Sequence, residues 1–563
     1  MSAAADRLAQ ARAWLRQDPD PETRDELAGL ITRAGSGDEA AIAELDDRFG
    51  SRLAFGTAGL RGELAAGSNR MNRVLVAQAA AGFAAFLLER SSGSAPTVVI
   101  GYDGRRNSRV FALDSAEIFA GAGLRAILLP RLLPTPVLAF AVRHLGADAG
   151  VMVTASHNPP NDNGYKVYLG GEDHGSQIVS PADAQIASHI QRVADEGDVR
   201  EIPRSSAYET AGEEVLDAYV SATAAVAPAP AGADGMRWVY TAMHGVGWET
   251  VERVLAAAGY PAPSTVAAQL RPDPTFRTVS FPNPEEPGAM DLSFARARET
   301  GAELVIANDP DADRLAVAVP DPSAPGGWRR LSGNDVGLLL GWRAARAARD
   351  TRVEGTASAS LACSLVSSPG LGAIAERYGL DFHETLTGFK WISRAPGIAF
   401  GFEEALGYLV NPDTVRDKDG ISAAVALLGL AAEARGRGAT LVDLLGELAA
   451  EIGHYASDQV SIRVEDISLI GRIMSALRAD PPASFGSAVV ASAEDLLTAG
   501  DGVPAGDVLR YRLADGSRVI VRPSGTEPKL KVYIDARAES AEAARTAVGA
   551  LADAVRELLA RLS

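Results

Sequence analysis

Short apolar runs alternate with segments of helical periodicity through much of this chain, and this alternation is the feature that most constrains its fold. Thr97–Asp103 and Val151–Val153 have the composition of buried strands, and Val110–Ala122 between them has the spacing of a helix. Leu304–Ile306 repeats the strand pattern after a helical segment at Glu249–Ala258. Strands that alternate with helices form largely parallel, helix-covered sheets, so the sequence predicts an α/β fold.

The two ends of the chain depart from this alternation. Ala4–Leu15 and Thr23–Arg33 are rich in good helix formers and are separated by Asp-Pro breakers, which predicts N-terminal helices. Near the C-terminus, strands at Arg518–Val521 and Leu530–Ile534 are followed by a long helix at Ala541–Leu562. We therefore expect a helical extension at the start of the chain and an α+β domain at its end.

The chain is too long for one hydrophobic core. Its 563 residues, 47% of them hydrophobic, predict about four domains at roughly 150 residues each. Segments rich in Pro, Gly and Ala at Val226–Gly232 and Pro320–Gly327 mark domain boundaries, and the region after Ile452 marks a third. We expect an extension at 1–50, then domains at 51–225, 235–322, 328–452 and 456–563.

Composition excludes several classes of function. Lys plus Arg number 54 against 72 Asp plus Glu, a net charge of −18, whereas binding to a phosphate backbone needs a basic surface. The single cysteine, Cys363, excludes an intrachain disulfide and a thiolate metal cluster. The N-terminus lacks the apolar core of a secretory signal, and the longest apolar run, Ile421–Ala432, is shorter than the ~20 residues that span a bilayer. We expect a soluble, cytoplasmic protein that binds neither nucleic acid nor membrane.

The segment VTASHNPPNDNGYK, residues 153–166, places Ser156 at the end of an apolar strand. Pro159 and Pro160 prevent the strand or a helix from continuing, and ligands bind at strand ends in α/β sheets. An ordinary turn is the alternative, because Ser, Asn, Pro and Gly all favour turns. Neighbours in an extended chain point to opposite sides, so a bond from His157 to the Ser156 hydroxyl is unfavourable. We therefore interpret His157 as a residue that shapes the loop.

A second loop, NDPDADR, follows the strand Leu304–Ile306. Asp309, Asp311 and Asp313 lie at alternate positions, so an extended segment would point all three one way, and without a cation they would repel. Carboxylates suit a hard divalent ion, Mg²⁺ first. An EF-hand is excluded because Arg314 and Pro320 occupy its glycine and glutamate positions. A solvated acidic turn is the remaining alternative.

Two further loops carry polar residues after strands. Glu403 and Glu404 could accept hydrogen bonds from sugar hydroxyls, although by themselves they favour a surface turn. The loop RPSGTEPKLK, residues 522–531, combines arginine, hydroxyls, glycine and lysines. These groups suit a phosphate monoester, and the pattern is not a Walker A loop. A basic turn between strands is its alternative.

The motifs TASHNP, DPDADR and RPSGTEP occur in this order, with FGTAGLRG at 55–62, and resemble the α-D-phosphohexomutase superfamily of phosphoglucomutases and phosphomannomutases. The resemblance runs from about Phe55 to the C-terminus. It implies four domains around a central cleft, three of them similar α/β domains with mixed or parallel sheets and the last a smaller α+β domain. FEEALGY, followed by Asp417–Gly420, is closest to the branch of phosphopentomutase-like and bacterial hexose mutases.

The resemblance also assigns roles to matching positions. Ser156 would carry the transferable phosphoryl group and, with Asp309, Asp311 and Asp313, hold Mg²⁺. Arg61, Lys166 and Lys390 match basic residues near the reacting phosphate, where general acid–base roles are sought. Lys166 is the better candidate for proton transfer than His157. The implied substrate-binding residues are His157, Arg314, Glu403, Glu404, Arg522, Ser524, Gly525, Thr526 and Lys531.

The implied activity is a reversible phosphoryl transfer between glucose 1-phosphate and glucose 6-phosphate. A phosphoserine enzyme and glucose 1,6-bisphosphate, the activator and intermediate, would connect the two. Ala405 stands where many phosphoglucomutases have serine, so mannose and pentose phosphates are alternative substrates. A serine-dependent phosphate hydrolase and a non-catalytic sugar-phosphate sensor are alternative classes. The partners expected are small sugar phosphates, and the expected assembly is a monomer or homodimer.

Overall fold

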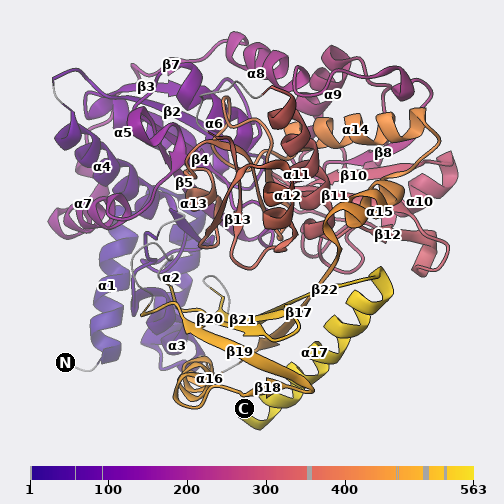
Figure 1. Cartoon of the computed structure of the whole chain (residues 1–563). Helices are drawn as coiled ribbons and strands as arrows, with labels where there is room; N and C mark the ends of the chain where they lie inside the picture. The colour runs from indigo at the N-terminus through magenta and orange to yellow at the C-terminus, as the bar shows by residue number, and fades with distance from the viewer. Residues whose placement is uncertain are drawn as a thin grey trace. The chain divides into compact units, whose positions relative to one another are not determined.

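The computed structural model describes residues 3–56, 59–91, 93–351, 358–464, 466, 468–498, 506–524 and 529–562. The chain divides into two compact units, Met1–Arg330 with Gly407–Gly436, and Leu331–Leu406 with Arg437–Ser563. The described residues form four β-sheets with helices packed on them (Figure 1), which confirms the predicted α/β class.

Three helices form the N-terminal extension: α1 (Ala3–Gln17), α2 (Pro21–Gly35) and α3 (Glu39–Phe49). Asp20 caps α2 by accepting a hydrogen bond from the Glu22 amide, with Pro21 at the first helical position, and Asp38 caps α3. The first two helices match the two predicted helical segments, and the third lies within the helical extension expected at 1–50.

The first sheet has the strand order β1-β5-β4-β2-β3-β7, with β6 beside β5. Strand β2 is parallel to β3 and β4, whereas β5 is antiparallel to both β1 and β4. The strands are β1 (Leu60–Glu63), β2 (Thr97–Tyr102), β3 (Arg125–Leu128), β4 (Ala149–Val153), β5 (Asp162–Leu169), β6 (Ser176–Gln177) and β7 (Glu209–Thr210). The helices are α4 (Arg73–Arg90), α5 (Ser108–Gly121), α6 (Thr135–His144), α7 (Ala182–Glu196) and α8 (Glu214–Ala224), with 3₁₀ turns at Gly171–Asp173 and Val199–Glu201.

The second sheet has the order β12-β11-β10-β8-β9. Strand β10 is parallel to β8 and forms an antiparallel hairpin with β11. The connection of this hairpin, residues 309–314, contains Asp309, Asp311 and Asp313 and is called the aspartate loop here. The strands are β8 (Trp238–Thr241), β9 (Ser264–Thr265), β10 (Leu304–Asn308), β11 (Leu315–Pro320) and β12 (Trp328–Arg330). The helices are α9 (Gly247–Ala258), α10 (Asp291–Thr300) and α14 (Gly420–Gly436), with 3₁₀ turns at Ala231–Ala233, Ala267–Gln269 and Pro325–Gly327; strand β16 (Gly407–Leu409) also belongs to this unit.

The long apolar run at Ile421–Ala432 forms the interior of α14, where most of its side chains are buried. No helix in the described part of the chain has the length and apolar character needed to cross a membrane.

In the second unit, β13 (Ser360–Ser364) lies between β14 (Asp381–Thr385) and β15 (Ile398–Glu403), parallel to both. Its helices are α11 (Gly333–Asp350), α12 (Gly370–Tyr378), α13 (Phe389–Ile392) and α15 (Leu441–Ile452). A six-stranded antiparallel sheet follows, with the order β17-β22-β21-β20-β19-β18, and α17 packs on β17 and β22 (Figure 1). Its elements are β17 (His454–Arg463), α16 (Ser468–Ala479), β18 (Ser484–Phe485), β19 (Ala488–Asp495), β20 (Leu509–Leu513), β21 (Arg518–Pro523), β22 (Lys529–Ala538) and α17 (Ala541–Leu562).

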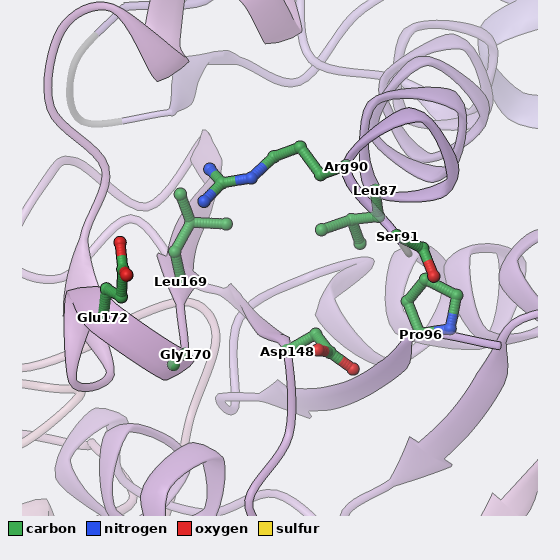
Figure 2. A pocket seen from close by; sticks show the side chains of 9 residues that line it. Leu87, Arg90, Ser91, Pro96, Asp148, Leu169, Gly170 and Glu172 are labelled. Atoms are coloured by element: carbon green, nitrogen blue, oxygen red, sulfur yellow. The ribbon is translucent and has the colours of Figure 1, made fainter. Parts of the chain in front are cut away.

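A cavity of about 190 Å³ opens at one edge of the first sheet, between the end of α4 and the end of β5. Figure 2 shows Arg90, Asp148 and Glu172 on different sides of this cavity. None of the candidate site residues lines this cavity.

Candidate active site

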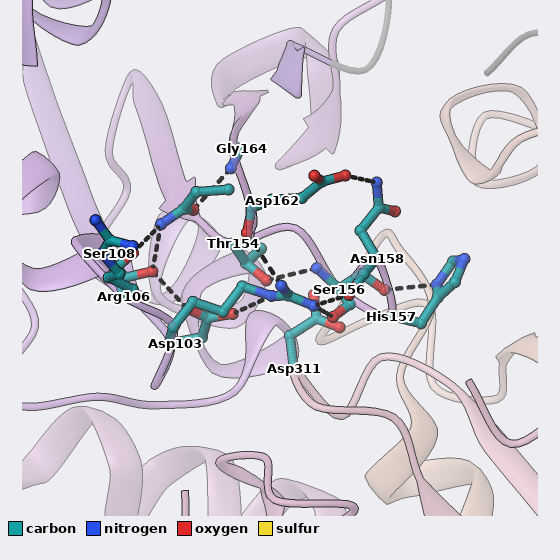
Figure 3. Close-up of polar contacts among 12 residues, drawn as sticks. Asp103, Arg106, Ser108, Thr154, Ser156, His157, Asn158, Asp162, Gly164 and Asp311 are labelled. Atoms are coloured by element: carbon teal, nitrogen blue, oxygen red, sulfur yellow. Dashed lines mark hydrogen bonds and ion pairs between the residues drawn. The ribbon is translucent and has the colours of Figure 1, made fainter. Parts of the chain in front are cut away.

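Ser156 lies in the loop that follows β4, as predicted, with 3% of its surface exposed. Its backbone is in the left-handed region, with φ at 50°. The Ser156 amide donates to Thr154 Oγ1 over 2.9 Å (Figure 3). The Ser156 hydroxyl donates to Asp309 Oδ2 over 2.7 Å. The hydroxyl therefore points toward the aspartate loop of the second sheet.

The prediction that His157 does not contact the Ser156 hydroxyl is wrong. His157 Nδ1 lies 3.1 Å from Ser156 Oγ (Figure 3). The alternation of side chains holds only for extended backbone, and the positive φ of Ser156 turns the chain so that both side chains lie on one side. Burial, together with the nearby Arg314 and Arg61, lowers the pKa of His157 well below its usual value, so the ring is neutral at pH 7.

The buried guanidinium of Arg105 holds the serine loop in this shape. It donates hydrogen bonds of 2.6–3.0 Å to the carbonyl oxygens of Ser156, Asn158, Pro159 and Asp162. Asp103 lies 3.7 Å from Arg105 Nε, and the guanidinium carbon lies 4.9 Å from the centre of the Phe276 ring. Arg105 thus combines four acceptors from one loop with a carboxylate and an aromatic face.

Asp309, Asp311 and Asp313 are each completely buried, and one oxygen of each lies within 4.8 Å of those of the other two. They converge as predicted, but on a turn rather than an extended segment. Ala312 has a φ of 58°, and its amide donates to the Asp309 carbonyl oxygen over 2.9 Å.

Two lysines neutralise part of the charge of this acidic cluster, and a threonine donates a hydrogen bond to it. Lys166 Nζ lies 2.7 Å from Asp311 Oδ2 and 2.8 Å from Asp313 Oδ2, and Lys418 Nζ lies 3.2 Å from Asp313 Oδ2. Thr135 Oγ1 donates to Asp311 Oδ2 over 2.6 Å. Burial opposes ionisation of Asp313, but Lys166 and Lys418 hold its pKa well below the usual range. Burial and the other two aspartates instead raise the pKa of Asp309.

The chemistry of the cluster suits a divalent cation. Asp311 Oδ1 and Asp313 Oδ1 are buried and have no hydrogen-bond partner among the described residues. Hydroxyl and carboxylate oxygens are the ligands that Mg²⁺ takes. The three aspartates, with Ser156 Oγ beside them, can therefore hold such an ion.

Arg61 and Lys166 reach the same region from neighbouring strands. On β1, Arg61 is paired with Gly164 of β5, and its Nη1 donates to Asn158 Oδ1 over 3.0 Å. Arg314 donates its amide to Asp309 Oδ1 over 2.9 Å. The first unit thus brings together the predicted residues Arg61, Ser156, His157, Lys166, Asp309, Asp311, Asp313 and Arg314.

The remaining predicted residues lie in the second unit. Glu403 ends β15 and is buried, and Glu404 Oε2 accepts hydrogen bonds of 3.2 Å from Ser364 and Ser367. Lys390 lies on α13, with its Nζ 5.5 Å from the centre of the Trp391 ring. Arg522 on β21 lies opposite Lys531 on β22 in the antiparallel register, and the Ser524 amide donates to the Lys529 carbonyl oxygen. Gly525 and Thr526 lie outside the described residues.

Sequence patterns missed Arg105, Thr135 and Lys418. Arg105 follows β2 in the polar segment YDGRRNS, which is the same strand-end signal that identified Ser156. Lys418 lies in the segment Asp417–Gly420, whose contact with Asp313 spans about a hundred residues. No local signal identifies Thr135.

Four consecutive segments of the chain match family models. Phosphoglucomutase/phosphomannomutase α/β/α domain I matches residues 52–196, domain II matches 217–324, domain III matches 332–452, and the C-terminal domain matches 479–552. The chain belongs to the phosphoglucomutase/phosphomannomutase family. It is therefore a member of the α-D-phosphohexomutase superfamily and an enzyme of the mutase class, an intramolecular phosphotransferase.

Relatives of this family resemble the chain over most of its length. A probable phosphomannomutase of Haemophilus influenzae is 54% identical, covering 87% of this chain and 98% of its own. The mouse phosphopentomutase is 35% identical, covering 94% of this chain and 90% of its own. A crystal structure of a phosphoglucomutase/phosphomannomutase family protein from Burkholderia thailandensis has a TM-score of 0.67 at 21% identity, covering 91% of this chain and 98% of that one. This structure supports the four-domain fold.

Proposed function

We propose that this mutase interconverts a sugar 1-phosphate and its terminal phosphate isomer, with glucose 1-phosphate and glucose 6-phosphate as the pair, through a phosphoserine at Ser156. The observation that carries the proposal is the Ser156 hydroxyl 2.7 Å from Asp309, inside a cluster of three buried aspartates. Phosphoryl transfer depends on positioning the reacting groups and on neutralising charge on the transferring oxygens, and a fixed hydroxyl next to a site for a divalent cation provides both.

In the first half-reaction, a free hydroxyl of the sugar phosphate attacks phosphorus of the phosphorylated Ser156. A bond forms between the sugar oxygen and phosphorus, the bond between Ser156 Oγ and phosphorus breaks, and the proton of the sugar hydroxyl ends on Ser156 Oγ. Asp309, Asp311 and Asp313 would hold Mg²⁺ with Ser156. When bound, this ion neutralises charge on the transferring oxygens and on Ser156 Oγ.

Basic side chains supply the remaining charge and a route for the proton. Lys166 and Arg61, on adjacent strands, donate to the transferring phosphoryl oxygens in this scheme. Lys166 is the proposed proton carrier, and Lys390 is a further basic candidate. The neutral ring of His157, 3.1 Å from Ser156 Oγ, is assigned to substrate binding.

The second half-reaction returns the other phosphate of glucose 1,6-bisphosphate to Ser156. The sugar must turn over between the two steps, so one set of residues has to bind it in both orientations. Arg522, Ser524, Gly525, Thr526 and Lys531 are assigned to the phosphate that is not transferred. Glu403 and Glu404 are assigned to the sugar hydroxyls, as acceptors.

The sugar is the finer part of the proposal. One relative is named for mannose phosphate and another for pentose phosphate, and Ala405 leaves no hydroxyl at the third position of the sugar loop. Glucose, mannose and ribose 1-phosphates are therefore to be assayed side by side, each with a trace of its bisphosphate. The highest kcat/KM on glucose 1-phosphate supports the proposal, and a preference of tenfold or more for another sugar replaces it.

The same assay separates a mutase from a hydrolase. A mutase converts glucose 1-phosphate to glucose 6-phosphate with little release of inorganic phosphate. Dominant release of inorganic phosphate would contradict the proposal, and binding without turnover would identify a sensor.

A further inference from the structure

Strand β21 in the second unit presents two different faces. Val519 and Val521 belong to the core of the C-terminal sheet and α17. Side chains alternate along a strand, so Arg518, Ile520 and Arg522 lie on the opposite face. That face is covered by residues from the end of β13 and the end of β14: Ile520 shares a separate apolar cluster with Leu365, Val366 and Leu386.

Arg518 occupies one end of this face and is 5% exposed. Its Nε donates to Asp535 Oδ2 over 2.8 Å, its Nη1 donates to Glu384 Oε1 over 3.0 Å, and its Nη2 donates to the Ser367 carbonyl oxygen. Arg510 Nη1 donates to the other oxygen of Glu384 over 3.0 Å. These bonds hold the buried guanidinium of Arg518 in one position. Removing one of its charged partners would leave a buried charge unpaired, which is costly.

Ser367 connects this guanidinium to the proposed sugar loop. It is completely buried, and its Oγ accepts a hydrogen bond of 3.0 Å from the Glu404 amide. The same Oγ lies 3.2 Å from Glu404 Oε2 and 2.8 Å from Ser364 Oγ. Ser367 thus binds Arg518 through its carbonyl oxygen and Glu404 through its hydroxyl.

The other end of the same face of β21 carries the proposed phosphate anchor. Arg522 Nη1 donates to Thr387 Oγ1, three residues from Lys390. One strand therefore carries Arg518, which is linked to the sugar loop, and Arg522, which begins the phosphate loop.

We propose that Ser367 is a positioning residue that fixes the distance between the sugar loop at Glu403–Glu404 and the phosphate loop at Arg522, and that this distance contributes to the choice between hexose and pentose phosphates. The inference rests on the proposed function. Counted from the hydroxyl on C2 or on C3, the path to the terminal phosphate is one carbon longer in a hexose 6-phosphate than in a pentose 5-phosphate. Two loops held at a fixed spacing can distinguish these lengths, whereas loops with a loosened link distinguish them less.

The test is Ser367→Ala, assayed on glucose 1-phosphate and ribose 1-phosphate. We expect KM for the preferred sugar to rise about tenfold, the cost of roughly one hydrogen bond to a charged group, with kcat within about threefold. The ratio of kcat/KM between the two sugars should move toward one. Ser368→Ala is the matched control, because Ser368 is buried next to Ser367 but its hydroxyl accepts from the Gly370 amide.

Equal loss on both sugars, or the same kinetics in both serine variants, would overturn the inference. If Ser367→Ala does not fold, Arg518→Lys removes the bond to the Ser367 carbonyl while keeping the charge, with the more exposed Arg512→Lys as its control. In Arg518→Lys, but not in Arg512→Lys, the ratio of kcat/KM between the two sugars should also move toward one. An unchanged ratio in Arg518→Lys would reject the connection through Ser367. A wild-type enzyme that turns over neither sugar would reject the proposed function instead.

Discussion

Ser156 Oγ and Asp309 Oδ2 lie 2.7 Å apart, although 153 positions separate the two residues in the sequence. The contact joins the loop after β4 of the first sheet to the hairpin connection of the second. The proposed phosphoryl carrier is thus hydrogen-bonded to Asp309, whose pKa is raised by burial and by Asp311 and Asp313.

Replacing Ser156 with alanine removes the atom that would carry the phosphoryl group. We expect turnover to fall by at least about a thousandfold while the affinity for glucose 1-phosphate stays within about threefold. A coupled assay and calorimetric titration measure the two quantities. Retained turnover would contradict the role of Ser156, and lost binding would make it a structural loop residue.

Replacing Arg105 with lysine tests whether the Arg105 guanidinium holds the loop of Ser156 in shape. An ammonium group has three donors on a flexible stem and cannot reproduce the four bonds to carbonyl oxygens. We expect kcat to fall about tenfold or more, with KM changed by less than about threefold and a lower Tm. Arg106→Lys is the control, because Arg106 is exposed and pairs with Glu22. Equal kinetics in Arg105→Lys and Arg106→Lys would show that Arg105 does not hold the loop of Ser156 in its functional shape.

Removal of divalent cations should abolish turnover without unfolding the protein. Lys166 and Lys418 pair with Asp311 and Asp313, and the raised pKa of Asp309 favours its neutral form. The cluster then carries little net charge when no ion is bound. We expect EDTA to stop the reaction, far-UV circular dichroism to stay unchanged, and added Mg²⁺ to restore activity. Irreversible unfolding in EDTA would contradict this expectation.

His157 should make the protein less stable in mild acid. Its folded pKa lies below the unfolded value of about 6.5 because of burial, Arg314 and Arg61. Below pH 6.5 the unfolded chain therefore binds a proton that the folded chain does not, and the free energy of unfolding decreases as pH falls. Urea unfolding between pH 8 and 5 should show a shallower decrease for His157→Asn than for the wild type. Parallel curves would show that His157 titrates normally.

The strands and the loops that follow them were predictable, because apolar runs that end abruptly in Ser156 or in Asp309–Asp313 carry a local signal. The contact between Ser156 and His157 was predicted wrongly, because it depends on a positive φ that is unusual for serine. Thr135 and Lys418 were missed because their contacts with Asp311 and Asp313 arise only when distant segments pack together. Local pattern thus identified the loops, and tertiary packing supplied their partners.

The N-terminal helices depend on residues that are synthesised after them. Trp14 of α1 meets Phe49 of α3 edge to face, with ring centres 5.9 Å apart, and both belong to a core that extends to Val199. Helices of 11–15 residues are marginal in isolation, and the chain leaves the ribosome N-terminus first. The three helices are therefore made before the first sheet, and they gain their packing partners only after that sheet has formed.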